Sequence, residues 1–329
     1  MGLQWDSRIF FPSDVTVSSQ VAINGCISSN DRAGSRKEYY RWLHRLSRDY
    51  DAILLRHSLG DFREPFIIGR LRTPVYLVHH TLEGPEISLK RGFRPKVKYA
   101  IEHYFGSMSV RRSRAIIPVT KEIKEYQLKR AGVNKLSFLY PNGAKVGNEL
   151  HLADRRCAQE SSFLFVASHF VPWHGLDRLI DAAAQSKDDF KIHVVGEVLA
   201  EDRRAMSGDP RFVHHGTLSS AEITTLSEEC SIGLASFALD RKGMAEACTL
   251  KVRDYLSMGL PVYSGHKDVF GQEFAYYRDG PCEMSQIMNF AIESNKWSKQ
   301  QVFNASRPLI DKRELLRDLY SFIDKDLRN

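Results

Sequence analysis

The feature that most constrains the fold is a regular alternation of short apolar runs with amphipathic stretches of helical periodicity. The helical patterns include residues 35–49 and 121–132 in the first half and 175–185 in the second. Short strands separated by amphipathic helices are typical of parallel sheets that carry helices on both faces. We therefore predict an α/β protein. The predicted strands are 8–11, 51–55, 74–79, 115–119, 136–140, 162–168, 190–196, 211–216, 231–236 and 259–265.

The chain has 329 residues, which suits two domains of about 150 residues each. The polar stretch 146–161 divides the two series of strands and has the composition of an interdomain linker. We predict Rossmann-like domains over residues 1–150 and 151–305, and a C-terminal helix over 306–329 that packs back on the N-terminal domain. Two such domains would face a central cleft. Ligands of these sheets bind at the carboxyl ends of the strands, beside helix N-termini.

Positive charge is concentrated in the first half of the chain. The net charge is +11 over residues 1–150 and −4 over the remainder, and residues 88–114 hold eight Lys and Arg against one acid, Glu102. This segment predicts contact with anionic lipid headgroups, nucleic acid or a phosphorylated substrate, unless it is an ordinary solvated helix face. Nucleic acid is disfavoured, because no recognisable stacking platform is interleaved with the charges.

Other features of the sequence exclude several classes of protein. No apolar run approaches the roughly 18 residues that span a bilayer. The first ten residues lack the charged region and apolar core of a signal peptide. The five cysteines have neither the paired spacing of a zinc site nor the pattern of a disulfide framework. We therefore expect a cytoplasmic protein.

Three loops that follow predicted strands offer groups for binding a ligand. The loop 168–174 supplies a hydroxyl, two imidazoles and an indole just before a helix, a setting that suits an anion. Gly196 and Gly216 each end a strand, and glycine allows another backbone or a flat ligand to approach closely. Packing explains Trp173 equally well, so each loop alone is a weak signal.

The stretch EACTLKVRDYLSMGLPVYSG, residues 246–265, carries the most specific signal. Thr249 can cap a helix, so the N–H groups near Leu250 and Lys251 would point outward and favour a diphosphate. The carboxylate of Glu246 would repel a phosphate, and it suits neutral hydroxyls instead. A polyol attached to a diphosphate satisfies both conditions, and that describes a nucleotide sugar. The alternative is that Glu246 is an ordinary surface acid.

Taken in order, these motifs resemble the donor-binding domain of GT-B glycosyltransferases, and more narrowly the large retaining family numbered four. The matching segments are FVASHFVPWHGLDRLIDA, VVGE, HHGTLSSAEI and EACTLKVRDYLSMGLPV. The PNG turn at 141–143 resembles that family's last stretch before the domain crossover. The resemblance covers roughly residues 45–265. It implies a nucleoside-diphosphate sugar as substrate, with no metal and no cofactor.

The resemblance also assigns roles to single residues. The family binds its donor with two glutamates separated by seven residues, and these positions are Glu246 and Asp254 here. Glu246 would hold the hydroxyls of the transferred sugar and Asp254 those of the ribose, although Asp is one methylene shorter. The backbone around Thr249 and Leu250 would bind the diphosphate. The predicted nucleotide-binding residues besides Asp254 are Gly196, Glu197, Thr217 and Leu218.

The chain departs from the family in the first loop of the C-terminal half. The family's Arg and Lys on the phosphates are replaced by Ser168 and His174, and His169 or Lys251 could supply part of the missing charge. A histidine beside a diphosphate is drawn toward its charged form. We therefore expect donor turnover to fall as His174 loses its proton.

The N-terminal half would form the acceptor side of the site. The family's histidine close to the sugar corresponds to His80, with His79 as the alternative, so Glu246 and His80 are the predicted catalytic residues. The family's Gly-rich first loop has no counterpart in residues 1–60. The first strand–helix unit is therefore expected to be absent or altered.

The implied reaction moves a sugar from a nucleoside diphosphate to a hydroxyl of a glycan or lipid-linked acceptor, with retention of anomeric configuration. This would be a step in cell-surface polysaccharide or glycolipid synthesis, with residues 88–114 touching the inner face of the membrane. Two alternatives remain. One is a nucleotide-sugar epimerase or inverting transferase on the same fold. The other is a non-catalytic protein that binds a sugar nucleotide or nucleic acid.

Overall fold

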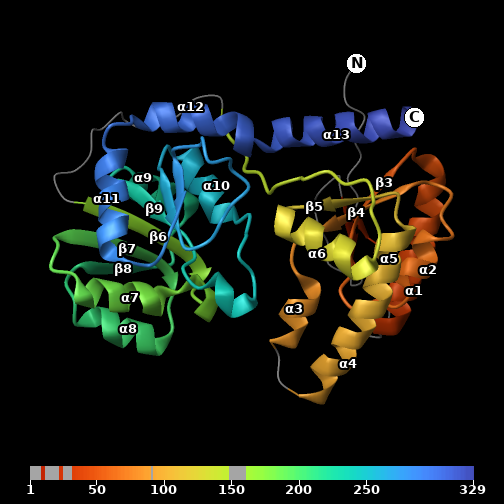
Figure 1. Cartoon of the computed structure of the whole chain (residues 1–329), viewed down its shortest axis with the longest axis horizontal. Helices are drawn as coiled ribbons and strands as arrows, with labels where there is room; N and C mark the ends of the chain where they lie inside the picture. The colour runs from red at the N-terminus through yellow and green to blue at the C-terminus, as the bar shows by residue number, and fades with distance from the viewer. Residues whose placement is uncertain (1–8, 12–21, 25–31, 90–91, 148–160) are drawn as a thin grey trace.

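The chain folds into two α/β bodies that lie side by side, with the last two helices running along both of them (Figure 1). Each body is built on a parallel sheet, so the predicted α/β class with two parallel sheets is confirmed. The predicted linker lies mostly outside the described residues. The computed structural model describes residues 9–11, 22–24, 32–89, 92–147 and 161–329.

The C-terminal sheet has six parallel strands in the order β11-β10-β9-β6-β7-β8. Phe163 of the central strand pairs with Ile192 on one side and Ile232 on the other. The edge strand β11 is short and polar, which is why its sequence did not predict it. The strands are β6 (Ser161–His169), β7 (Phe190–Glu197), β8 (Phe212–Gly216), β9 (Ile232–Leu234), β10 (Val262–Ser264) and β11 (Tyr277–Asp279).

Both faces of this sheet are buried, and this explains its unbroken apolar strands. Phe163 and Phe165 pack into the core on one face, under α7, α8 and α11, whereas Leu164 packs on the other face, under α10 and α12. The helix α9 also packs on that second face through Ile223 and Leu226. The helices are α7 (Leu176–Gln185), α8 (Ala200–Ser207), α9 (Ser220–Ser227), α10 (Leu250–Ser257), α11 (Met284–Ser294) and α12 (Lys299–Ile310).

The N-terminal sheet has three parallel strands, β3 (Ile53–Arg56), β4 (Val75–His79) and β5 (Ala115–Pro118), in that order. The predicted strand at 136–140 is an extended segment beside β5, where Ile116 N–H donates to Leu136 O at 3.1 Å. Two further strands, β1 (Ile9–Phe11) and β2 (Ala22–Asn24), form a separate parallel pair. The remainder of residues 1–31, where the first strand–helix unit was expected to be absent or altered, lies outside the described residues.

Six α-helices belong to the described part of the N-terminal body. The predicted long helix near residues 88–112 is divided by a π-helical segment, Glu102–Gly106. Such segments often occur at functional or strained positions, and here Glu102 turns inward and is buried. The helices are α1 (Arg32–Leu46), α2 (Glu64–Ile68), α3 (Glu83–Ser88), α4 (Phe93–Ile101), α5 (Ser107–Arg112) and α6 (Lys121–Ala131).

The last two helices connect the bodies. Helix α12 packs on the C-terminal body, and α13 (Lys312–Arg328) crosses to the N-terminal sheet, where Leu319 lies in one cluster with Tyr76 (Figure 1). Asp311 separates the two helices and caps α13 by accepting a hydrogen bond from the N–H of Arg313 at 2.9 Å. The helix expected to start at 306 therefore starts at Lys312, because residue 306 is still inside α12. No described helix is long and apolar enough to cross a membrane.

Tyr76→Phe is expected to loosen the docking of α13. The hydroxyl of the buried Tyr76 donates to the half-buried Asp326 at 2.5 Å, and a hydrogen bond to a charged acceptor contributes about 1.5–3 kcal/mol. Arg114 still pairs with Asp326 at 2.9 Å in this variant. We therefore expect the free energy of unfolding, measured with urea, to fall by about 1.5 kcal/mol, the lower end of this range. The control is Tyr104→Phe, at a ring that is 65% exposed. Equal urea midpoints for the two variants would contradict the assignment.

Candidate functional site

The predicted donor-site loops of the C-terminal body all lie at the carboxyl edge of its sheet. Ser168 and His169 end β6, and Gly196 and Glu197 end β7. Thr217 and Leu218 follow β8 directly. His169 and Glu197 are register partners, so the first two loops are neighbours. Parallel strands bring such loops together at one edge, which is where α/β sheets bind ligands.

Gly196 allows two of these loops to meet. Its φ is +121°, and a Cβ atom there would lie 1.6 Å from the carbonyl oxygen of Ala167. No side chain fits, so only glycine is compatible with this close approach. His214 Nε2 donates to the Gly196 carbonyl at 2.9 Å and fixes the turn from the next strand.

His169, which could supply part of the missing charge, pairs with an acid of the neighbouring loop. Its Nε2 lies 2.9 Å from a carboxylate oxygen of Glu197, and both side chains are largely exposed. An exposed pair of this kind contributes little to stability. It does give His169 a partner at the rim of the loops.

Thr249 is the N-cap residue of α10, as predicted, and polar groups near the first turn of the helix have no partner in the described chain. Thr249 has extended backbone angles, yet its side chain makes no capping hydrogen bond. Its Oγ1 is buried and has no hydrogen-bond partner within the described residues. Leu250 is 58% exposed beside it. The N–H groups of a helix's first turn have no partner inside the helix and attract anions.

Lys251 is buried in the same turn. Its Nζ lies 5.2 Å from the centre of the Phe165 ring and has no hydrogen-bond partner among the residues described. Burial lowers the pKa of Lys251 to about 7. A buried ammonium group without a counter-charge is unfavourable, so this position is suited to an anion that the ligand-free protein does not contain.

His266, just after β10, adds a third unused group. Its Nδ1 lies 2.8 Å from Ser264 Oγ and 3.0 Å from Tyr277 Oη, which fixes the ring. Its Nε2 is buried and unpartnered within the described chain. Burial lowers the pKa of His266, and Lys251 acts in the same direction. No sequence motif indicated His266, because only the sheet order brings its loop to this edge.

His174, which is expected to gain charge beside a diphosphate, is neutral in the ligand-free protein. Burial lowers its pKa to about 3, and the positive charges of Lys251 and Lys242 act in the same direction. Its ring packs edge-on against Phe170 with centroids 5.7 Å apart, and its Nδ1 accepts the N–H of Val171 at 3.3 Å. The dependence of turnover on the proton of His174 stays a prediction for the donor-bound state.

Glu246 lies where the two bodies meet. Its Oε2 accepts the backbone N–H of Glu122, at the start of α6, at 2.9 Å. In return, the carboxylate of Glu122 accepts the N–H groups of Glu246 at 2.8 Å and Ala245 at 3.1 Å. No described residue bonds to the other oxygen of Glu246, Oε1. The sequence did not indicate Glu122, because this contact joins residues 124 positions apart.

The PNG turn also reaches the other body. Asn142 Nδ2 donates to Cys248 O at 2.5 Å, and Arg253 Nε donates to Asn142 O at 3.0 Å. Arg253 is fully buried and pairs with Asp268 through both guanidinium nitrogens, at 2.5 and 2.6 Å. Asp254, the next residue of α10, is exposed, and no described side chain donates to its carboxylate.

The two candidate histidines after β4 differ in accessibility. His80 is exposed, whereas His79 is fully buried, and its Nδ1 forms a hydrogen bond with Oε1 of Glu83 at 2.8 Å. Burial is the main cause of the lowered pKa of both rings. Of the two, His80 is therefore the one that a ligand could reach.

A buried network of histidines and acids supports the strand ends of the N-terminal body. His57 lies between Glu64 at 2.5 Å and Glu102 at 2.9 Å. Burial alone would lower the pKa of His57, but the two carboxylates raise it to about 10. His57, His79 and Glu83 offer ligand atoms within 4.8 Å of one another. A protonated imidazole with both nitrogens engaged does not ligate a metal, so we assign the cluster a structural role.

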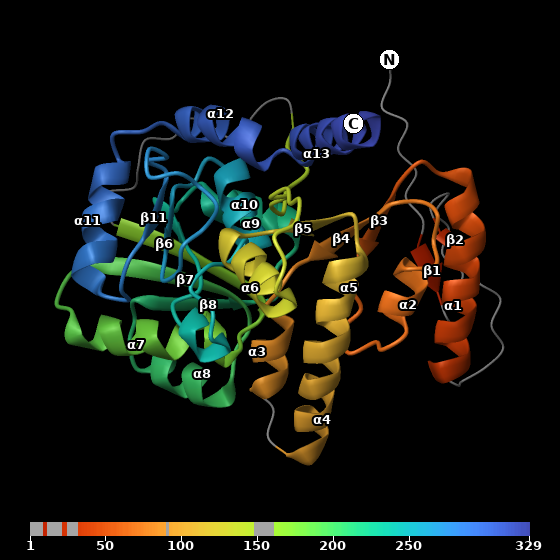
Figure 2. The same cartoon turned by 45° about the vertical axis from the view of Figure 1, so that its right-hand side comes forward.

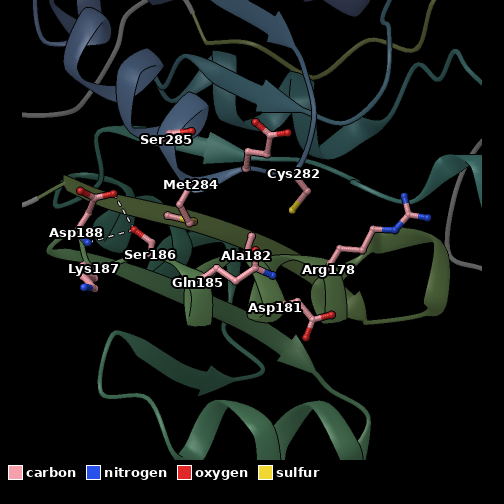
Figure 3. A pocket seen from close by; sticks show the side chains of 11 residues that line it. Arg178, Asp181, Ala182, Gln185, Ser186, Lys187, Asp188, Cys282, Met284 and Ser285 are labelled. Atoms are coloured by element: carbon pink, nitrogen blue, oxygen red, sulfur yellow. Dashed lines mark hydrogen bonds between the residues drawn. The ribbon is translucent and has the colours of Figure 1, made fainter.

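One pocket of the C-terminal body lies away from these residues. It has a volume of about 580 Å³ and lies between α7 and the start of α11 (Figure 3). Arg178 and Asp181 line it together with Lys187 and Asp188, so its charges are mixed. None of the donor-site residues lines it, and it is not the candidate site.

Solved structures with a similar fold are glycosyltransferases. Sucrose-phosphate synthase from Thermosynechococcus elongatus has a TM-score of 0.67 at 14% identity, over 98% of this chain and 89% of that one. HepE from Anabaena, in complex with UDP and glucose, has a TM-score of 0.63 at 14% identity, over 91% and 84%. The apo lipopolysaccharide outer core galactosyltransferase WaaB has a TM-score of 0.60 at 11% identity, over 90% and 83%.

These likenesses define the class of fold. Two parallel-sheet bodies joined by crossing C-terminal helices, together with these neighbours, show that the chain has the GT-B fold. The GT-B part of the expectation is thus confirmed. No protein-family model and no curated protein matches the chain, so the narrower assignment to family four stays a prediction.

Proposed function

We propose that the protein is a retaining glycosyltransferase that uses a nucleoside-diphosphate sugar. One observation carries the proposal: Thr249 Oγ1, Lys251 Nζ and His266 Nε2 are all buried without a partner in the described chain, near the N-terminus of α10. Hydrogen-bond donors and a cation that lack partners beside a helix N-terminus suit a diphosphate. The solved complex of HepE with UDP and glucose supports the same class of donor.

In the proposed reaction the bond between the anomeric carbon and the diphosphate oxygen breaks. The acceptor oxygen forms the new bond on the same face of the sugar, and its proton passes to the leaving diphosphate. Lys251 and the first turn of α10 would stabilise the negative charge that develops on the leaving group. His174, which is neutral in the ligand-free protein, would act as a hydrogen-bonding group.

Glu246 would recognise the transferred sugar through its carboxylate. Glu122 holds the backbone of residues 245–246, and the N–H at the start of α6 holds Oε2, so Oε1 is left to accept sugar hydroxyls. His80, exposed after β4, would contact the sugar from the other body. Asp254, Gly196, Glu197, Thr217 and Leu218 would bind the nucleotide. We propose that the reaction needs no metal or cofactor.

The acceptor would be a glycan or a lipid-linked molecule, and the enzyme would work at the cytoplasmic face of a membrane. Support comes from α4, which has no buried residue and extends away from both bodies (Figures 1 and 2). Phe93 is 78% exposed on this helix, next to the exposed cations Arg94 and Lys96. Apolar and basic side chains together on one exposed helix suit an anionic interface.

The proposal is tested by thermal unfolding with a panel of UDP-, GDP- and ADP-sugars, followed by NMR of the product. One donor is expected to raise the midpoint, because only a ligand of the native state stabilises it. The anomeric configuration should be retained in the product. Inversion would favour an inverting transferase, and conversion of the donor without an acceptor would favour an epimerase. Stabilisation without turnover against any glycan or lipid-linked acceptor would favour a binding protein.

A further inference from the structure

A second site lies on the outer side of the N-terminal body, away from the donor-site residues. A groove of about 760 Å³ runs between α1 and α2, which lie side by side at the margin of the molecule farthest from the C-terminal sheet (Figure 2). Its lining includes five cationic side chains and no acid. These cations are Lys37, Arg41, Arg45, Arg63 and Arg70.

The five cations have no counter-charge among the residues that the structure describes. No ion pair joins any of them to an acid within the described part of the chain. Asp61, a buried acid of the same body, already accepts the hydroxyl of Tyr40 at 2.8 Å and pairs with Arg36 at 3.1 Å. The guanidinium carbon of Arg63 lies 4.9 Å from the centre of the Phe62 ring. Five like charges around one groove repel one another, and an anion would relieve that repulsion.

One wall of the groove is apolar. Phe66 is 42% exposed, and Ile67 is half-buried beside it. Arg112 covers the Phe66 ring at 5.1 Å and donates to Pro65 O at 2.9 Å, so the ring is held in place. A free phosphate ion would not use such a wall. A molecule that carries both a phosphate and an apolar part would use both features.

We propose that this groove binds the phosphate headgroup of an anionic lipid, with the arginines of α1 and those that flank α2 on the phosphate and the apolar part of the lipid against Phe66 and Ile67. Arginine suits phosphate because its planar fork donates two hydrogen bonds at once. The site is separate from the donor site and does not rest on the proposed transfer reaction. It is also separate from the exposed helix α4.

The test is binding of the full chain to phosphatidylglycerol and phosphatidylcholine vesicles near physiological salt. The groove variant is Arg41→Glu/Arg45→Glu, and the control is Arg203→Glu/Arg204→Glu, which changes the same charge on exposed positions of α8. We expect the wild-type protein to bind phosphatidylglycerol vesicles and not phosphatidylcholine vesicles. The affinity for phosphatidylglycerol vesicles should fall about tenfold or more in the groove variant and should stay within about twofold of wild type in the control. Melting temperature and UDP-sugar binding should be unchanged in both, which shows that they fold.

Other results would overturn the proposal. Equal losses in the groove variant and the control would mean that only net charge matters. If Arg94→Glu/Lys96→Glu abolished vesicle binding while the groove variant still bound normally, the lipid contact would be assigned to α4. Displacement of the vesicles by millimolar inorganic phosphate would indicate a site for a free anion. Displacement by single-stranded RNA at the same salt would indicate nucleic acid.

Discussion

Lys251→Met is expected to weaken donor binding by about 10–100-fold while making the ligand-free protein more stable. The Lys251 ammonium group is buried with no described partner, and methionine fills a similar volume without its charge. A hydrogen bond to a charged group contributes about 1.5–3 kcal/mol, which is the basis of the expected loss of affinity. Removing the buried charge should raise the free energy of unfolding by roughly 2–4 kcal/mol at pH 6.

Opposite changes in stability and binding distinguish a ligand-binding lysine from a packing residue. A packing residue would lose stability when replaced, and it would affect binding only through that loss. The control is Lys187→Met at an exposed position, which should change neither quantity. Calorimetric titration with the UDP-sugar chosen by the panel and urea unfolding give the two readouts. A Lys251→Met protein that is less stable and still binds its donor normally would exclude Lys251 from the diphosphate site.

We also expect the stability and the donor affinity of the wild-type protein to depend on pH through Lys251. The pKa of Lys251 is about 7 in the folded protein, below its ordinary value of 10.5, so between these values the unfolded chain binds more protons. Stability of the wild-type protein should therefore rise with pH across this window, and the advantage of Lys251→Met should shrink over it. Donor affinity should fall as pH rises above 7, because the diphosphate binds the charged lysine. In Lys251→Met the affinity should not change over that range.

The position of this cation bears on the point at which the chain departs from the family that its sequence resembles. The resemblance expects a lysine at position 174, where this chain has a histidine that is neutral when unbound. Lys251 and His174 are close enough for the charge of one to lower the pKa of the other. In the ligand-free protein the loop after β6 therefore carries a neutral histidine, and the nearby buried amine is that of Lys251 in the first turn of α10.

The sequence predicted the features that depend on local pattern. Apolar runs located the main strands of both sheets, and Gly196 was correctly taken as a point of close approach, because such an approach excludes any side chain. Thr249 was correctly placed at the start of α10. These features are local because they depend on side chains within a few residues of each other.

Features that depend on contacts between distant segments could not be predicted. The charge state of His174 depends on Lys251 and Lys242, which the fold brings near it. The role of Glu122 depends on how the two bodies meet, and β11 forms because β10 offers an edge to a polar segment. In each case the energy of the contact depends on burial and distance, which spacing along the chain does not reveal.

Glu246→Gln is expected to lower the rate of sugar transfer by about 10²–10³-fold while nucleotide binding changes little. Glutamine keeps the size of the side chain and can still accept the N–H of Glu122, so the contact between the bodies is retained. It loses the negative charge that strengthens hydrogen bonds from sugar hydroxyls, each of which contributes about 1.5–3 kcal/mol. Steady-state kinetics with the UDP-sugar and calorimetry with UDP alone separate the two effects, since UDP has no sugar for Glu246 to hold.

Two neighbouring acids serve as controls for this result. Glu125→Gln, at an exposed position of α6, should leave transfer unchanged. Glu122→Ala removes the carboxylate that holds the N–H groups of Ala245 and Glu246, so it should lower transfer by displacing the Glu246 backbone, and less than Glu246→Gln does. If Glu122→Ala lowered transfer as much as Glu246→Gln, the contact between the bodies would be the essential feature. If Glu246→Gln transferred sugar at the wild-type rate, Glu246 would only join the two bodies, and the sugar would have to be bound elsewhere.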